Sequence, residues 1–158
     1  MGTIMEEKLN VHVRWMIRRD LSNMLRIERQ CFESPWTGDD FIRCLRLNHC
    51  IGMVAEHGYQ MAGFMLYELH RNRLNLVNFA VAKRYQRRGV GTAMMRKLDM
   101  KIHPSGRNSI TTCVSEFNLG AQLFFKSQGF EAVSVLHEYF RGSHADAYLM
   151  QKKCEGDQ

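Results

Sequence analysis

The sequence predicts a single α+β domain with a central mixed, mostly antiparallel sheet of about seven strands flanked by about four helices. Two observations support this fold class. Three β-rich segments, 50–56, 60–70 and 74–81, follow one another through short turns, which favours antiparallel pairing. The pattern before them is strand, helix, helix, and the pattern after them is helix, strand, helix, strand, strand, with no internal repeat or domain boundary.

The N-terminal third predicts one strand and two helices. Residues 11–17 are β-rich and form the first strand. Asp20 is the expected N-cap of the first helix, and Thr37 is the expected N-cap of the second, after a break at 34–36. Helical spacing assigns to the core Leu21, Met24, Leu25, Ile27, Cys31 and Phe32 in the first helix, and Phe41, Ile42, Leu45 and Leu47 in the second.

The C-terminal half predicts two more helices and three strands. A helix after residues 86–92 should end at Pro104 and Gly106, and a strand follows at 109–114. The last helix spans 118–128, with Gly129 as a left-handed C-cap, and the final strands are 130–136 and 146–152. The residues expected to face the core are Met94, Met95, Leu98 and Ile102 in the earlier helix, and Leu119, Leu123 and Phe124 in the later one.

Length and composition predict a single globular domain. The chain has 158 residues, 45% of them apolar, so residues 1–158 are expected to form one domain with its core in 11–152 and polar ends. The N-terminus lacks the apolar stretch of a signal peptide, and the longest apolar runs are shorter than the ~20 residues of a membrane helix. These features predict a cytoplasmic protein without a membrane partner.

The cysteines predict neither a zinc site nor a disulfide framework. There are five of them, an odd number, and no two form a C-x-x-C pair. Reduced thiols fit this usage best, and no metal site is expected.

The net charge of +6 favours an anionic ligand or partner. A polyphosphate cofactor, an acidic protein surface and nucleic acid all have this chemistry. Nucleic acid is the least favoured, because the basic residues are not interleaved with aromatic ones in the pattern of a known binding module. A basic face that serves only solubility explains the charge equally well, and a ribosome-associated partner would also suit it.

The strongest local motif is the segment 86–92, QRRGVGT, between a strand and a helix. Its two glycines let the backbone approach a ligand, and amides at the start of a helix bind anions. Arg87 and Arg88 add positive charge at the same place. No lysine follows the second glycine as in a P-loop, and Met94 occupies the third glycine position of a dinucleotide fingerprint. A tight strand-to-helix turn without a ligand is the alternative interpretation.

This motif and its surroundings resemble the GNAT acetyltransferases. The segment 86–91 is similar to the family's Q/R-x-x-G-x-G/A signature and follows an N-x-A-V strand at 78–81. The helix from Asn118 to Gly129-Phe130 resembles the family's N-x-x-A-x-x-x-Y…G-F pattern. The resemblance covers about residues 11–152 and implies the GNAT fold, in which the sheet splits between strands at the acetyl-CoA site.

Two further segments are similar to the RimI-like branch, whose members acetylate protein N-termini. Ser34-Pro35-Trp36-Thr37 resembles the P-W segment of that branch, and Tyr139-Phe140 with 146–150 resembles its ending. The resemblance implies an acetyl-CoA-dependent N-acetyltransferase that moves an acetyl group directly to a primary amine, with the α-amino group of a ribosomal-type protein as the first expectation. The alternatives are a small-molecule amine acetyltransferase and an acetyl-CoA-binding regulator with little catalysis.

The resemblance also implies which residues bind the cofactor. The amides of the signature loop would bind the pyrophosphate, and the strand before it would hold the pantetheine arm through its backbone. Asn118 would hydrogen-bond the same arm, although an N-cap role explains it equally well. The expected cofactor residues are Phe79, Ala80, Val81, Arg87, Arg88, Gly89, Val90, Gly91, Thr92, Asn118 and Phe125.

The catalytic residues depart from the family pattern. Cys113 occupies the position of the RimI-like glutamate, and Phe125 occupies that of the tyrosine that protonates the leaving thiolate. A phenyl ring has no proton to give, and a thiol is a weak substitute for a carboxylate. Water could protonate the thiolate. Otherwise Tyr139 is the first candidate and Glu116 the second, against a packing role for Tyr139 and a solvated loop charge for Glu116. The sequence leaves the acceptor and the oligomeric state open.

Overall fold

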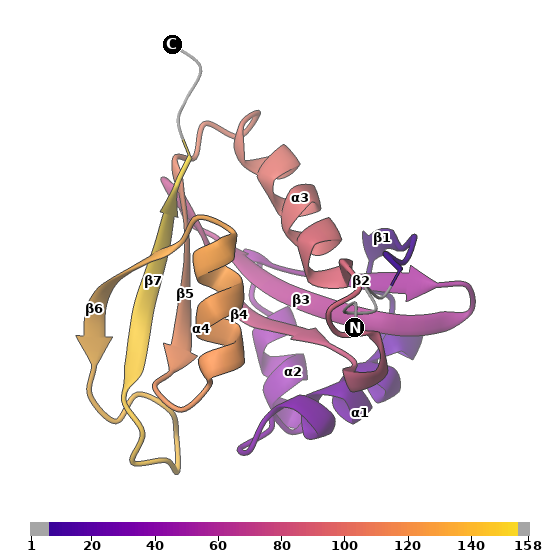
Figure 1. Cartoon of the computed structure of the whole chain (residues 1–158), viewed down its shortest axis with the longest axis horizontal. Helices are drawn as coiled ribbons and strands as arrows, with labels where there is room; N and C mark the ends of the chain where they lie inside the picture. The colour runs from indigo at the N-terminus through magenta and orange to yellow at the C-terminus, as the bar shows by residue number, and fades with distance from the viewer. Residues whose placement is uncertain (1–6, 155–158) are drawn as a thin grey trace, which may run out of the picture. The chain divides into compact units, whose positions relative to one another are not determined.

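The computed structural model describes residues 7–154, which form seven strands and four α-helices in the predicted order (Figure 1). The helices are α1 (Leu21–Cys31), α2 (Gly38–Leu45), α3 (Val90–Ile102) and α4 (Leu119–Ser127). The strands are β1 (His12–Trp15), β2 (Cys50–His57), β3 (Gln60–Leu69), β4 (Arg73–Val81), β5 (Ser109–Ser115), β6 (Glu131–Leu136) and β7 (Ala147–Lys153). Short 3-10 turns, η1 (Arg18–Asp20) and η2 (Lys83–Tyr85), precede α1 and follow β4.

The strands form one sheet in the order β1-β2-β3-β4-β5-β7-β6. The pairs β1–β2, β5–β7 and β6–β7 are antiparallel, whereas β4 and β5 are parallel. The parallel register runs from Arg73 opposite Ser109 to Leu76 opposite Thr112, and β4 itself continues to Val81. The prediction of a mixed, mostly antiparallel sheet is therefore confirmed.

The chain forms two compact units. Unit 1 contains residues up to 66 together with 78–97, and unit 2 contains 67–77 together with the residues from 98 onward. That the chain works as one domain with its core in 11–152 stays a prediction. Within residues 7–154, no helix combines the length and the apolar character that a membrane span requires.

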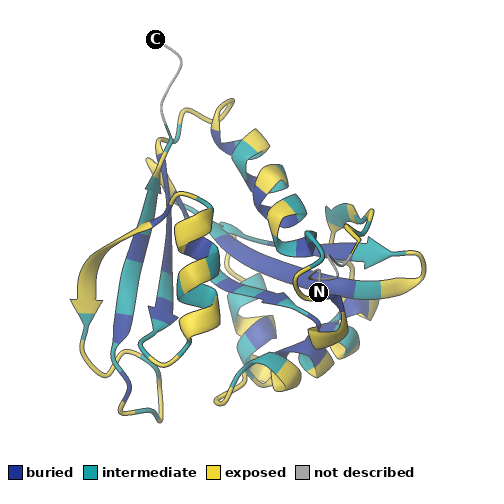
Figure 2. Ribbon diagram, viewed as in Figure 1, coloured by how far each residue is buried: buried dark blue, intermediate teal, exposed yellow. Residues whose placement is uncertain are grey.

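In unit 1, the ribbon of α2 carries both buried and exposed residues (Figure 2). The buried residue of α2 is Phe41, which is fully buried. Its ring meets Trp36 and Phe64 edge-on, with centroids 5.1 and 5.6 Å apart. The prediction that Ile42 and Leu47 face the core is wrong, because both are exposed. Ile42 follows Phe41 by one residue and so points about 100° away around the helix, and Leu47 lies beyond the end of α2.

The two predicted N-caps of unit 1 have different outcomes. Thr37 caps α2 as predicted, since its hydroxyl accepts from the Asp40 amide at 3.2 Å. Asp20 precedes α1 but makes no capping bond to it. Its carboxylate instead accepts from the Arg14 guanidinium at 2.8 and 2.9 Å and from the Ile17 amide at 2.7 Å. The hydrogen bond from Arg14 lowers the pKa of Asp20, so the carboxylate stays charged and ties the turn before α1 to β1.

In unit 2, α4 packs through Phe125, whose ring meets Phe124 and Phe130 edge-on. The prediction that Leu119 and Leu123 face the core is wrong, because they are 62% and 58% exposed. The two leucines are four residues apart and share one helix face, while Phe125 lies on another. Gly129 ends the helix with a φ of +96°, which confirms the predicted left-handed C-cap.

Candidate active site

The predicted cofactor loop has two left-handed residues in unit 1. Arg87 has a φ of +62° and Gly89 a φ of +84°. Positive φ is rare for a residue with a side chain, whereas glycine adopts it readily. Left-handed residues in such a turn direct successive amides to one side, which creates a concave site for anions. The loop conformation therefore fits a phosphate ligand.

The loop leads directly into α3, which begins at Val90. The Ala93 amide donates to the Gly89 carbonyl at 3.0 Å, so the predicted residues Val90, Gly91 and Thr92 form the first helical turn. Amides of a first turn have no carbonyl partner within their own helix, and the helix dipole makes that end positive. Both effects favour an anion at this end of α3.

A segment that the sequence analysis assigned to the polar N-terminal end supports this loop. The Leu9 amide donates to the Arg88 carbonyl at 2.9 Å, and Arg88 Nε donates to the Glu7 carbonyl at 3.2 Å. A Cβ atom on Gly89 would lie 3.5 Å from Lys8 Cγ. Lys8 therefore adds a third cationic side chain beside the loop, next to Arg87 and Arg88. No periodicity or motif in residues 7–9 indicated this contact.

The strand before the loop is tightly packed at its C-terminal end. A Cβ atom on Gly63 would lie 2.7 Å from the Ala80 carbonyl oxygen, so only glycine fits beside β4 here. The Val81 carbonyl accepts from the Gln86 side chain at 3.0 Å and from the Cys31 thiol at 3.2 Å. These bonds fix the backbone of the stretch predicted to hold the pantetheine arm.

A buried carboxylate in unit 1 joins α1, the following loop and β4. Glu28 is 2% exposed, and it accepts from the Trp36 amide at 3.0 Å and from Asn78 Nδ2 at 2.8 Å. Burial raises the pKa of Glu28, and the two hydrogen bonds oppose that shift. Glu28 thus positions the Pro35-Trp36 segment against the strand that precedes the cofactor loop. No sequence motif marks the position of Glu28 in the helical pattern, so this role could not be predicted from the sequence.

In unit 2, the structure gives Asn118 and Phe125 clear packing roles. Asn118 Oδ1 accepts from the Ala121 amide at 3.1 Å, so the N-cap interpretation is confirmed. The Phe125 side chain is buried against Phe130. Their contacts with the cofactor stay predictions.

Tyr139, the first candidate acid, lies beside Cys113. The Tyr139 hydroxyl and the Cys113 thiol lie close enough to shift each other's pKa. Burial, the neighbouring Cys113 and the charge of Glu68 raise the pKa of Tyr139 to about 12, although the residue is 51% exposed. Burial also raises the pKa of Cys113, against the opposing effect of Tyr139. At neutral pH the phenol and the thiol are therefore both protonated, and Tyr139 can serve as a hydrogen-bond donor but not as a base.

Glu68, which the sequence analysis missed, begins a polar chain in the same unit. Its carboxylate accepts from Asn75 Nδ2 at 2.9 Å, and Asn75 Oδ1 accepts from the Thr111 hydroxyl at 2.9 Å. His70 Nε2 lies 3.5 Å from the same Glu68 oxygen. This hydrogen-bonded series connects β3, β4 and β5, and it holds the Glu68 carboxylate near the Tyr139 phenol. Its members are 43 residues apart in sequence at the extremes, so no local pattern could reveal it.

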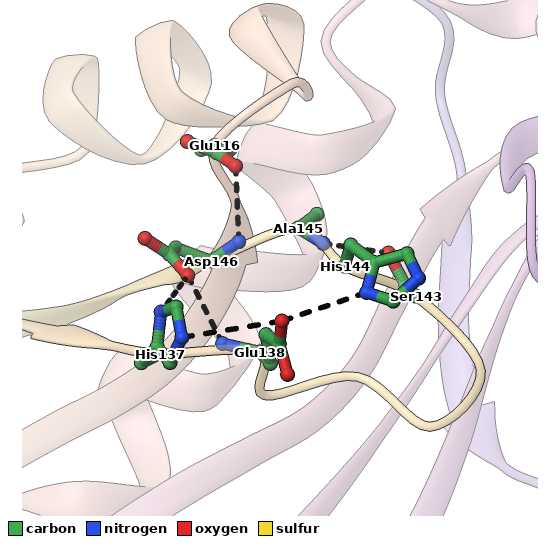
Figure 3. Close-up of polar contacts among 7 residues, drawn as sticks. All are labelled: Glu116, His137, Glu138, Ser143, His144, Ala145 and Asp146. Carbon is green, nitrogen blue, oxygen red and sulfur yellow. Dashed lines mark hydrogen bonds and ion pairs between the residues drawn. The ribbon is translucent and has the colours of Figure 1, made fainter.

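Glu116, the second candidate, is hydrogen-bonded to Asp146, the residue before β7 (Figure 3). Its Oε1 accepts from the Asp146 amide at 3.0 Å, and its own amide donates to the Asp146 carbonyl at 2.9 Å. These contacts give Glu116 a structural role, and a catalytic one stays a prediction. Among residues 7–154, no group of three or more His, Cys, Asp or Glu side chains is arranged to hold a metal ion.

Comparison with known proteins defines the class. The model of the Acetyltransferase (GNAT) family matches residues 21–130, which is well over half of the chain. The protein therefore belongs to the GNAT acetyltransferase family, and acetyl-CoA is its co-substrate.

Relatives and solved structures are similar to the chain over most of its length. The chain is 28% identical over 152 residues to the N-alpha-acetyltransferase RimI of Mycobacterium tuberculosis, covering 87% of this chain and 89% of the relative. Its fold matches the ribosomal-protein-S18-alanine N-acetyltransferase of Escherichia coli with a TM-score of 0.83 at 21% identity, over 94% and 97% of the two chains. Arabidopsis thaliana NAA60 in complex with acetyl-CoA matches with a TM-score of 0.77 at 17% identity, over 91% and 98%. The GNAT fold predicted from the sequence is confirmed.

Proposed function

We propose that this acetyltransferase modifies the α-amino group of a protein N-terminus, with Tyr139 as a hydrogen-bond donor to the departing thiolate. The observation that carries the proposal is the proximity of Tyr139 to Cys113. It brings a phenol to the position where the family resemblance leads us to expect a catalytic carboxylate. The names of two similar proteins, an N-alpha-acetyltransferase and a ribosomal-protein-S18-alanine N-acetyltransferase, support this acceptor.

The reaction forms one bond and breaks another. The neutral amine attacks the thioester carbonyl, a C–N bond forms, the C–S bond breaks, and CoA leaves as a thiolate while the amine loses a proton to solvent. A cysteine thiol, the closest side-chain analogue of the CoA thiol, has a pKa of about 8.5, well below the value of about 12 for Tyr139. Complete proton transfer from the phenol to the thiolate would be uphill. Tyr139 therefore stabilises the thiolate by donating a hydrogen bond.

The absence of a carboxylate at position 113 bears on the choice of amine. Cys113 stays protonated at neutral pH and cannot serve as a base. An enzyme without a strong base needs an acceptor that is already partly neutral. An α-amino group, with a pKa of about 7.7–8.0, meets this condition, whereas a lysine amine, at about 10.4, is almost wholly charged. The chemistry therefore favours an N-terminal α-amine over a lysine side chain.

The cofactor role of the loop belongs to the same proposal. We assign the pyrophosphate to the amides of residues 87–92, with Arg87, Arg88 and Lys8 contributing charge. The left-handed residues Arg87 and Gly89 and the start of α3 support this assignment. The net charge of +6 suits an acceptor on the ribosome, which we propose as the site of action.

A peptide panel tests the proposal. Thiol release from acetyl-CoA is followed with three acceptors: a peptide with its α-amine and one internal lysine, the same peptide with a blocked N-terminus, and a set of small primary amines. We expect acetylation of the first peptide only, and mass spectrometry should locate the acetyl group at its N-terminus. Acetylation of the lysine, or faster turnover of a small amine, would contradict the proposed acceptor.

A further inference from the structure

The connection between β6 and β7 carries Tyr139 and is fastened by one carboxylate. Asp146 Oδ1 accepts from the Glu138 amide at 3.0 Å and lies 2.9 Å from His137 Nδ1 (Figure 3). Glu138 immediately precedes Tyr139 in the chain. The hydrogen bond from its amide therefore fixes the backbone at the residue that leads into the candidate donor.

Glu138 has an unusual backbone conformation. Its φ is +44°, in the left-handed region that residues with a side chain rarely adopt. Such a conformation persists when surrounding contacts hold it. The bond to Asp146 is such a contact, because it satisfies the amide of the strained residue. Without it, the connection could relax and carry the Tyr139 side chain away from Cys113.

Asp146 is in turn anchored to the end of β5. Its amide donates to Glu116 Oε1 at 3.0 Å, and its carbonyl accepts from the Glu116 amide at 2.9 Å. Glu116 directly follows β5, the strand that carries Cys113. Tyr139 and Cys113 are thus linked through Glu138, Asp146 and Glu116.

The ion pair of Asp146 with His137 is the weaker of its contacts. The His137 side chain is 83% exposed, and exposed ion pairs contribute little. The pKa of Asp146 is lowered first by the Glu138 amide and then by the hydrogen bond from His137. The carboxylate is therefore charged at neutral pH, and its main partner is the backbone next to Tyr139.

We infer that Asp146, anchored by Glu116, is a positioning residue that holds the Tyr139 hydroxyl against Cys113 for the acetyl transfer. This inference rests on the proposed role of Tyr139. Asp146 acts through the tyrosine connection and does not itself contact the reacting atoms.

The test is a double-mutant cycle between Asp146 and Tyr139. Asp146→Ala is expected to lower kcat by about 10- to 100-fold through misplacement of Tyr139, with the KM for acetyl-CoA nearly unchanged. Asp146→Asn, which keeps an acceptor oxygen, should recover most of the rate. In a Tyr139→Phe background, Asp146→Ala should cause no further loss. The matched control is Glu131→Ala, which removes an exposed carboxylate from β6.

A spectroscopic readout separates positioning from general loss of structure. In Asp146→Ala, the pKa of Tyr139 should fall from about 12 toward the ordinary tyrosine value of 10.0, because the phenol becomes less buried and leaves Cys113 and Glu68. The shift is measured by ultraviolet difference titration against Tyr139→Phe. The inference would be overturned if the kcat losses of the two single variants added up in the double variant, or if the Tyr139 pKa did not change in Asp146→Ala. Unchanged turnover in Tyr139→Phe alone would instead overturn the proposed function.

Discussion

The cofactor loop in unit 1 and the tyrosine connection in unit 2 are built on different principles. Residues 86–92 form a candidate anion site from backbone amides, two left-handed residues and the start of a helix. The connection at 137–146 depends on side chains: Asp146 and Glu116 hold the backbone, and Tyr139 meets Cys113. A backbone site is encoded by glycine spacing within a few residues, whereas a side-chain site depends on residues far apart in sequence. A backbone site should be impaired by substitutions that fill the space beside its amides. A side-chain site should be impaired by the removal of a single functional group.

The largest effect is expected from Gly89→Glu. The side chain would force a strained backbone at a φ of +84° and bring a carboxylate to the anion site. We expect acetyl-CoA affinity to fall by about 100-fold or more, measured by isothermal titration calorimetry. Gly91→Glu should have a similar effect.

The matched control for that experiment is Gly58→Glu. Gly58 also has a positive φ, +61°, and has no atoms within 4 Å of an added Cβ. It therefore tests the same backbone strain away from the loop. Equal affinity losses in the control and in Gly89→Glu would mean that the loop is not the binding site.

The second-largest effect is expected from Tyr139→Phe. This change removes one hydroxyl and leaves the ring contact with Phe140 in place. Loss of the donor should lower kcat by about 10- to 100-fold with little change in the KM for acetyl-CoA. Steady-state thiol-release kinetics measure both values, and a mutant with full turnover would remove Tyr139 from the mechanism.

A smaller effect separates two roles of Glu116. Glu116→Gln keeps an oxygen that can accept from the Asp146 amide, so an anchoring role predicts turnover within about threefold of the unmodified enzyme. Glu116→Ala removes the acceptor and should resemble Asp146→Ala. If Glu116 were the catalytic base, both substitutions would lower kcat equally, because neither side chain can take up a proton.

The smallest effect concerns the pH dependence of stability through Glu28. Burial raises the pKa of Glu28 above its unfolded value of 4.5. The stabilising contribution is therefore complete below pH 4.5 and is lost as the pH rises through the folded pKa. Between pH 4.5 and the folded pKa of Glu28, the free energy of unfolding of the unmodified protein should fall relative to that of Glu28→Gln. Urea unfolding from pH 4 to 8 measures this difference, and parallel profiles for the two proteins would contradict it.

The sequence predicted all seven strands, all four helices and their order, because each segment is long enough to show its own periodicity. It also located the loop, since the glycines and the helix that follow them are contiguous. It assigned Leu119 and Leu123 to the wrong face of α4, because apolar residues on two sides of a short helix leave the buried face undetermined. Burial of Phe125 shows which face packs.

The side-chain contacts were much less predictable. Sequence patterns singled out Tyr139, Cys113 and Glu116, but they did not indicate that the first two lie beside each other. Glu68 and Lys8 carried no signal, and Asp146 appeared only as part of the segment 146–150 that resembles the RimI-like ending. Their roles arise from strand register and from the path of loops, which depend on packing across the whole unit and not on local spacing.

The most direct test of the account is the pH dependence of kcat/KM for an α-amine peptide acceptor. If the enzyme supplies no strong base, kcat/KM should rise about tenfold per pH unit and level off near the α-amino pKa of roughly 7.7–8.0. Its midpoint should move with the acceptor when a peptide of different α-amino pKa is used. A midpoint that stays at one pH for both peptides would reveal a titrating base on the enzyme and contradict the account.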